Sequence, residues 1–265
     1  MGRFKKAIQF RLLMEDKPYS PPPGVLSGIR NARIPHANVD SLLREYISAW
    51  RVATEGGVID LKPAGGGKAH AQDNWIQKYN SQEGEFEGKR MIIAPDVYRA
   101  GKSGLIELVR SLRNGFCNPL LVTGDRDVYI GDCTHARIIH NYGSTIPGVQ
   151  PIESIVEVPV YRDDQDARAD RVLKDNEGIK LAQARFGTTY GPDEIGEALV
   201  FLSGMKLDEI YLRTPLLKER ARYPERAVVF SSILNRFFVY GIDPITDNGG
   251  RSRGVLIKQL EAAQK

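Results

Sequence analysis

The sequence predicts an α+β protein with a small mixed sheet at its centre. Three observations support this class: a helical pattern early in the chain, short strand-like runs alternating with helical patterns from about residue 88, and almost uniformly helical patterns after residue 193. We therefore expect a basic, partly helical N-terminal extension over residues 1–88, a compact α+β domain over 89–182, and a helical C-terminal region over 183–265.

The N-terminal extension contains one clear helix candidate and one glycine loop. Apolar residues recur at helical spacing within Val39–Val52. The loop Pro63–Lys68 superficially resembles a phosphate-binding loop. A P-loop, however, has glycine where this chain has Lys62, and Ser or Thr where it has Ala69. We interpret the loop as a linker.

The central region should alternate between short strands and short helices. Its polar turn, Gly124-Asp125-Arg126, should separate two of the strands. The expected strands are Arg90–Ile93, Asn118–Thr123, Asp127–Ile130 and Ile155–Tyr161, and the expected helices are Leu105–Leu112, Thr134–Asn141 and Asp164–Lys174.

The C-terminal region is predicted to be helical throughout. The expected helices are Asp193–Leu202, Leu207–Leu212, Arg226–Tyr240 and an amphipathic segment from about Val255. Apolar side chains would surround most of the Arg226–Tyr240 helix, which favours a core helix. This helix could also mediate a homodimer.

Composition limits the protein class. The chain has 265 residues, of which 42% are hydrophobic and 26% charged, as in soluble globular proteins. No apolar run approaches the roughly 20 residues that a membrane span needs, and the charged start of the chain does not resemble a signal peptide. The only two cysteines lack a CxxC spacing. We expect a cytoplasmic protein with no membrane partner.

Charge is distributed unevenly along the chain. Residues 1–68 carry 11 basic and 6 acidic side chains, residues 69–204 carry 15 and 20, and residues 205–265 carry 11 and 7. Basic flanks around an acidic centre are compatible with flanks that contact nucleic-acid phosphates and a centre that holds a metal ion. Scattered surface charge would explain the same pattern.

The segment Gly131–Arg137 carries the most suggestive chemistry. If a helix begins after this glycine turn, its free backbone N–H groups would face an anion. Thr134 would add a hydroxyl, and His135 and Arg137 would add charge-assisted hydrogen bonds to phosphate. Farther along, Asp175 and Asn176 supply the oxygen ligands that Mg²⁺ accepts, although a cap at the C-terminal end of a helix would explain this pair as well.

Three ordered segments between Met91 and Lys180 resemble the ParB/sulfiredoxin-like nucleotide-binding superfamily: PDVYR with the following LIELVRSLRNG and NPLLV, the turn GDCTHAR, and ESIVEVPVYRDDQDARADRVLKDNEGIKLA. The resemblance implies a nucleoside triphosphate, ATP or CTP, bound with Mg²⁺. It implies contacts to the nucleotide from Arg99, Lys102, Gly131, Asp132, Thr134, His135 and Arg137. It departs from the partition proteins at Cys133-Thr134, where they carry two arginines.

These inferences predict a Mg²⁺-dependent protein that hydrolyses a nucleoside triphosphate or transfers its γ-phosphate, in a DNA-associated setting. Asp132 would orient or deprotonate the attacking water or hydroxyl, with His135 as the second catalytic residue, and Asp175 and Asn176 would hold the metal. Two alternatives stay open. One is a nucleotide-gated DNA-binding module without turnover, with Pro192–Ile210 as a conceivable helix-turn-helix. The other is a kinase for a small hydroxyl compound of the amino-acid type.

Overall fold

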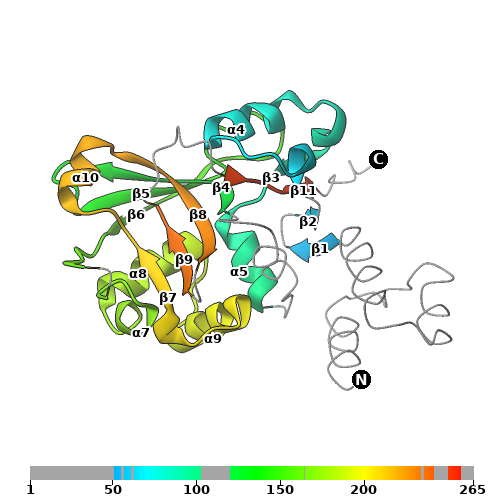
Figure 1. Ribbon diagram of the computed structural model, residues 1–265. Helices are drawn as coiled ribbons and strands as arrows, with labels where there is room; N and C mark the ends of the chain where they lie inside the picture. The colour runs from blue at the N-terminus through cyan, green and yellow to red at the C-terminus, as the bar shows by residue number, and fades with distance from the viewer. Residues whose placement is uncertain are drawn as a thin grey trace, which may run out of the picture.

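The computed structural model describes residues 51–54, 57–60, 63–102, 120–163, 165–233, 236–241 and 250–257. These residues form two β-sheets and several helices, with a curled mixed sheet at the centre (Figure 1). The predicted α+β class is confirmed. Among the described residues, no helix is both long and apolar enough to cross a bilayer.

The smaller sheet brings together distant parts of the chain. Its order is β1 (Arg51–Thr54), β2 (Gly57–Asp60), β11 (Gly254–Ile257) and β3 (Lys89–Met91), and all its pairings are antiparallel. The predicted helix from Val255 is therefore wrong at its start. Val255 lies fully buried in β11, which pairs on both sides, so its backbone is satisfied by neighbouring strands instead of a helix.

The larger sheet is mixed. Its order is β6 (Ile152–Glu157), β5 (His135–His140), β4 (Leu120–Ile130), β8 (Glu225–Ile233), β9 (Arg236–Tyr240) and β7 (Ile210–Arg213). Strand β7 runs parallel to β9, and the short β10 (Gly250–Arg251) runs parallel to β4, whereas the other pairs are antiparallel. Because β8 pairs with β4, the sheet crosses the expected boundary after residue 182.

Two predicted helices are strands of this sheet. Thr134–Asn141 contains β5, in which exposed His135 and Arg137 alternate with buried Ala136 and Ile138, the period of a strand. Arg226–Tyr240 contains most of β8 and all of β9. It is rich in β-branched and aromatic residues, and its apolar side chains from Ala227 to Phe230 fill the chain's own core. They are not a surface for a dimer partner.

The polar turn predicted at Gly124-Asp125-Arg126 is also wrong. These residues lie inside β4, a continuous strand of 11 residues. The pairing of β4 with β8 shifts register between Val122 and Arg126, so the strand contains an irregularity at this point instead of a chain reversal.

Six helices accompany the sheets in the described residues. They are α4 (Gln72–Ser81), α5 (Ala94–Lys102), α7 (Ala169–Val172), α8 (Asn176–Phe186), α9 (Pro192–Ser203) and α10 (Leu217–Arg222). The helix predicted at Asp193–Leu202 is confirmed by α9. The helix predicted over 164–174 shrinks to the short α7. Leu207–Leu212 is a 3₁₀ turn followed by β7, so that helix prediction is wrong.

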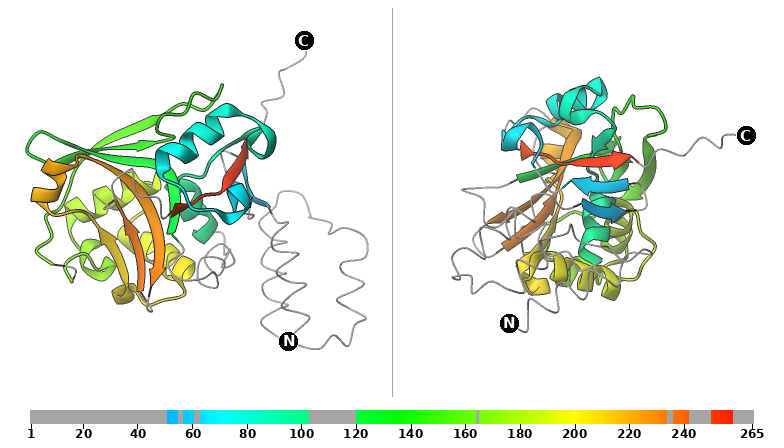
Figure 2. Two further views of the ribbon diagram at one scale, coloured as in Figure 1. Left: turned by 45° about the horizontal axis from the view of Figure 1, so that its top comes forward. Right: turned by 90° about the vertical axis from the view of Figure 1, so that its right-hand side faces the viewer.

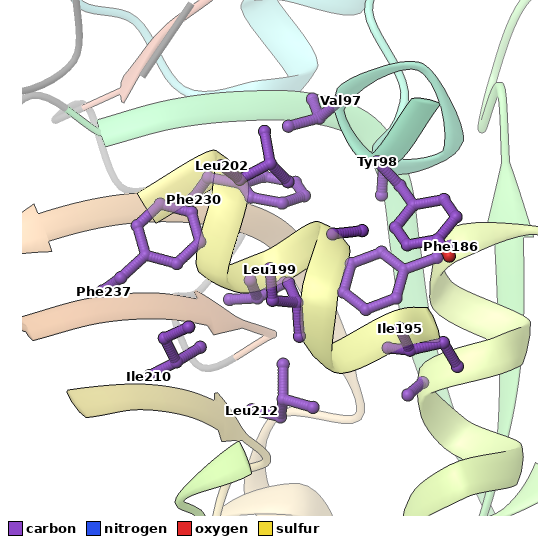
Figure 3. Packing of buried hydrophobic residues seen from close by; sticks show 14 of the residues in the cluster. Val97, Tyr98, Phe186, Ile195, Leu199, Leu202, Ile210, Leu212, Phe230 and Phe237 are labelled. Carbon is purple, nitrogen blue, oxygen red and sulfur yellow. The ribbon is translucent and has the colours of Figure 1, made fainter. Parts of the chain in front are cut away.

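Helix α9 lies at the centre of the main core. Figure 3 shows its Leu199 and Leu202 between two layers, with Phe230 and Phe237 of the sheet on one side and Phe186 of α8 on the other. All five side chains are nearly inaccessible to solvent. The rings of Tyr98 in α5 and Phe186 are stacked, with their centroids 5.2 Å apart. Helices α5, α8 and α9 thus share one core with the sheet (Figure 2).

Some predictions fall outside the described residues. The helix at 39–52 lies there except for Arg51 and Val52, which belong to β1, and the helix Leu105–Leu112 lies there entirely. The strand predicted from Asn118 is described only from Leu120, where β4 begins.

Candidate functional site at the β4–β5 hairpin end

A tight turn over residues 131–134 joins β4 to β5. Gly131 and Cys133 adopt left-handed backbone conformations, with φ of 57° and 67°. The Asp132 carboxylate accepts hydrogen bonds from the Thr134 backbone N–H at 3.1 Å and from its hydroxyl at 2.7 Å. The Thr134 hydroxyl oxygen also lies 3.1 Å from Nδ1 of His135. Three predicted site residues therefore form one hydrogen-bonded chain.

The backbone of this turn does not form the predicted anion cradle. A strand follows it, so there is no helix N-terminus whose free N–H groups could receive phosphate. The Cys133 N–H donates to the Ile130 carbonyl, and the Thr134 N–H donates to Asp132. The prediction of a helix-borne cradle at Gly131 is wrong because β5 pairs with β6 along its whole length.

Two glutamates outside the set of predicted site residues complete the neighbourhood of His135. Glu157 lies directly opposite His135 in the β5–β6 ladder, and such cross-strand partners project from the same face. The Glu157 carboxyl group lies close enough to Glu177, in the first turn of α8, to raise the pKa of Glu177. The signal in the sequence is weak: Glu157 lies inside a predicted strand, and Glu177 directly follows the Asp175-Asn176 pair.

The two predicted metal ligands lie at the same end of α8 as Glu177. Asp175 is the N-cap residue of α8, and its carboxylate accepts the Gly178 backbone N–H at 3.0 Å. Asn176 is the first residue of the helix and is exposed. The capping explanation thus holds for Asp175 at a helix start, where the sequence analysis expected a helix end. We call Asp132, Thr134, His135, Glu157, Asp175 and Glu177 the hairpin-end cluster.

The electrostatics of the hairpin-end cluster differ between its two parts. Hydrogen bonds from the Thr134 hydroxyl and backbone hold the pKa of Asp132 below its ordinary value. The pKa of Glu177 is raised above its ordinary value. The largest cause is burial, followed by the charges of Glu157 and Asp175 and by the side-chain contact with Glu157.

The remaining predicted nucleotide contacts are placed less favourably. Arg137 lies on the exposed face of β5, where its Nε donates to the Glu153 carboxylate at 2.7 Å. Arg99 and Lys102 belong to α5, whose first residue, Ala94, donates its N–H to Asp125 in the middle of β4. A strand rises about 3.3 Å per residue, so the start of α5 is roughly 20 Å along β4 from Gly131. The structure does not bring Arg99 or Lys102 to the hairpin end.

The described residues contain no group of three or more His, Cys, Asp or Glu side chains arranged to hold a metal ion. A small cavity lies elsewhere, beside Tyr79, Arg90 and Tyr142, with a volume of about 20 Å³. That volume accommodates about one water molecule. It is far too small for a nucleotide.

A second polar cluster, absent from the sequence predictions, lies inside the fold. The three consecutive side chains Asp125, Arg126 and Asp127 of β4 are at most 2% exposed. Asp125 pairs with His140, and Asp127 forms an ion pair with the buried Arg185 of α8. Arg126 pairs with the partly exposed Asp73 and Glu225, both at about 2.7 Å or less, and its guanidinium lies 3.7 Å from the centre of the Tyr142 ring.

This buried cluster has the bonding of a structural network. Gln72 of α4 accepts from Arg126 and donates to the Asp125 and Thr123 carbonyls, so the cluster fastens α4 to β4. The sequence gives no sign of a role for His140, because no partner stands near it in the chain. Its partner Asp125 lies 15 residues earlier and meets it only through the antiparallel pairing of β4 with β5.

Comparisons of the chain with protein-family models, with curated proteins and with solved structures found no match. The resemblance to the ParB/sulfiredoxin-like superfamily therefore stays a prediction, and the hairpin-end cluster is interpreted from its own geometry.

Proposed function

We propose that this chain binds a nucleoside triphosphate, ATP or CTP, together with Mg²⁺ at the hairpin-end cluster, and hydrolyses it or transfers its γ-phosphate. One observation carries the proposal. Glu157 lies opposite His135 in the β5–β6 ladder and close to Glu177, beside the Asp132–Thr134 turn, so carboxylates, a hydroxyl and an imidazole gather at one end of the sheet. Perturbed carboxyl groups held together at a surface are typical of functional sites.

The coordination preference of Mg²⁺ fits a site with few protein carboxylates. Magnesium keeps several waters and is usually bound by one or two protein carboxylates together with the phosphates of its nucleotide. The pair Glu157 and Glu177 could supply these carboxylates, with the exposed Asn176 as a neighbouring oxygen donor. Asp175 is the weaker ligand, because one of its oxygens caps α8. On this proposal the metal arrives with the nucleotide.

The phosphates would be positioned mainly by side chains. His135 and the Thr134 hydroxyl face the same exposed end of the hairpin, and Arg137 is two residues farther along the same strand face. Exposed ion pairs contribute little to stability, so Arg137 could exchange Glu153 for a phosphate at low cost. Asp132, whose pKa is lowered, stays ionised and could orient the attacking water or hydroxyl.

Calorimetric titration with ATP and CTP, each with and without Mg²⁺, tests the binding step. The wild type should bind at least one nucleotide, only when Mg²⁺ is present. His135→Ala should weaken binding at least tenfold, whereas Arg99→Ala in α5 should leave it unchanged. Absence of binding to every nucleotide, or equal affinities for the wild type and His135→Ala, would refute the proposal.

Turnover and the alternative acceptors need a separate measurement. Phosphate release in the presence of Mg²⁺ indicates hydrolysis, and Asp132→Asn should reduce it without weakening nucleotide binding. If nucleoside diphosphate forms only when a small hydroxyl compound is added, the protein is a kinase. If the nucleotide binds but neither product forms, the protein is a nucleotide-binding module without turnover.

The DNA-associated setting is a further proposal that rests on the basic flanks alone. The helix-turn-helix considered for Pro192–Ile210 is wrong, since a 3₁₀ turn and a strand follow α9 where a recognition helix would be needed. Binding to duplex DNA that falls steeply as salt increases would support the setting. Weak binding to DNA that does not depend on salt would contradict the DNA-associated setting.

A further inference from the structure

The side chain of His140 lies where two helices meet the large sheet. It is the last residue of β5 and is only 4% exposed. Its Nδ1 is 2.6 Å from the Asp125 carboxylate of β4, and its Nε2 is 3.0 Å from the Ala184 carbonyl in the last turn of α8. The second oxygen of Asp125 accepts the N–H of Ala94, the first residue of α5.

Both partners of the imidazole are hydrogen-bond acceptors. A carboxylate lies at one ring nitrogen and a backbone carbonyl at the other, so both nitrogens must donate if both contacts are to be hydrogen bonds. Only the imidazolium carries two N–H groups. In the neutral ring, one lone pair would face an oxygen at hydrogen-bond distance in a buried place, which is costly.

The position in the fold favours the charged form as well. The Ala184 carbonyl, which also accepts the Gly187 N–H at 3.3 Å, belongs to the C-terminal turn of α8, where the helix dipole attracts a cation. Gly187, which ends α8 with a φ of 56°, has room for no side chain, because an added Cβ would lie 2.9 Å from Pro95 of α5. The two helices therefore approach each other closely at His140.

The other charged groups near His140 are accounted for. On β4, Asp127 is neutralised by Arg185, the residue after Ala184 in α8. Arg126 is directed to Gln72, Asp73 and Glu225, and Asp96 of α5 is paired with Arg90 at 2.7 Å. Burial alone would lower the pKa of His140, but the Asp125 charge and the hydrogen bonds to Asp125 and Ala184 outweigh it and raise that pKa.

We propose that protonated His140 is a pH-sensitive latch that holds the C-terminal end of α8, and through Asp125 the start of α5, against the sheet. While both ring nitrogens of His140 are protonated, the end of α8 and the start of α5 stay packed against the sheet. When one of these protons is lost, this packing is weakened. It does not depend on the proposed nucleotide site.

The direction of the pH effect follows from proton linkage. The pKa of His140 is raised in the folded protein above the ordinary value of 6.5. Its stabilising contribution is therefore complete below pH 6.5 and is lost as pH rises from there through the folded-state pKa. For one linked proton, the opening equilibrium grows by at most about tenfold per pH unit in this window.

Nitrogen NMR of the wild-type side chains tests the charge state directly. The chain has four histidines, so each ring can be assigned. At pH 6, both nitrogens of His140 should show imidazolium shifts. The ring of His70, which packs edge-on against Trp75 at 4.8 Å, serves as the comparison. A neutral tautomer of His140 at pH 6 would overturn the proposal.

Hydrogen exchange then tests the latch. Above pH 6.5, the protection factors of the last turn of α8 should fall with pH, by up to tenfold per unit, while those of β8 and β9 stay constant. In Asp125→Asn the His140 midpoint should drop by at least one pH unit, and His140→Gln should make α8 protection independent of pH. Constant α8 protection in the wild type from pH 6 to 9 would overturn the proposal even if neither variant folds.

Discussion

Strand β4 carries charged residues in its interior, and the turn and strand that follow it carry a second polar set that differs from the first in almost every physical respect. Asp125, Arg126 and Asp127 are buried, and each has an ion-pair partner. Beyond the end of β4, Asp132 in the turn and the exposed His135 in β5 lie at the hairpin end, where the hydrogen bonds of Asp132 are short-range contacts within the turn. The β4–β5 hairpin thus contains a buried polar network within β4 and an exposed one beyond its end.

The difference separates structure from function. A buried charge must be paired, because removing it from water is costly, so its partners are fixed by the fold. An exposed carboxylate can exchange its partner for water, a metal ion or a ligand at little cost. The buried cluster therefore stabilises the protein, and the hairpin-end cluster is the better candidate for chemistry.

The largest expected effect comes from breaking the buried ion pair. In Asp127→Asn the guanidinium of Arg185 stays buried without its counter-charge, and the free energy of unfolding should fall by about 3–5 kcal/mol. Urea denaturation measures this change. A loss below about 1 kcal/mol would show that water reaches Arg185 and that the buried and exposed clusters do not differ as described.

A substitution that crowds the same pair should have a smaller effect. A Cβ added at Gly241 would lie 2.5 Å from the Asp127 carboxylate, so Gly241→Ala should cost about 1–3 kcal/mol through forced displacement. Gly196→Ala in α9 is the matched control. Its added Cβ would meet Leu207 at an ordinary 3.5 Å, and the helix should gain about 0.5–1 kcal/mol. Equal effects at the two glycines would contradict the packing around Asp127.

Removal of the α8 cap should have an intermediate effect. Asp175→Ala leaves the Gly178 N–H without its acceptor and should cost about 1 kcal/mol, whereas Asp175→Asn should retain most of the stability. Thermal denaturation of the two variants distinguishes capping from metal binding. If Asp175→Asn keeps stability but loses Mg²⁺-dependent nucleotide binding, Asp175 is also a ligand.

The smallest effect on stability is expected at the hairpin end itself. Asp132→Asn and His135→Ala should leave the denaturation midpoint nearly unchanged, because both side chains are exposed. The functional effect should be the reverse, with nucleotide binding weakened in His135→Ala. A midpoint that falls as far as in Asp127→Asn would place these residues in the structural network instead.

The elements predicted correctly are those with a strong local signal. Helix α9 begins with proline and carries apolar residues at helical spacing, and β3 (Lys89–Met91) overlaps the predicted run Arg90–Ile93 at Arg90 and Met91. The stretch Arg226–Tyr240 was misassigned because an almost continuous apolar run fits a buried helix and a buried strand equally well. The alternation of His135, Ala136, Arg137 and Ile138 did contain a strand signal, but the expectation of a helix after the glycine turn took precedence.

The candidate site was predictable only in part. The hairpin end was selected from His135, Thr134 and Asp132, which lie close together in the sequence, and the α8 end was selected from Asp175-Asn176. The link between them could not be predicted, because Glu157 and Glu177 meet only through β6 and α8 packing. For the same reason the Asp125–His140 contact was missed, since it depends on the register of β4 with β5.

Paramagnetic NMR with Mn²⁺ in place of Mg²⁺ tests the central claim most directly. In the presence of ATP or CTP, the metal should first broaden the amide signals of residues 131–135, 157–158 and 175–178, while those of α5 and of the interior of β4 stay sharp. Broadening centred on α5 or near Asp125, or no selective broadening with any nucleotide, would contradict the assignment of the hairpin end as the functional site.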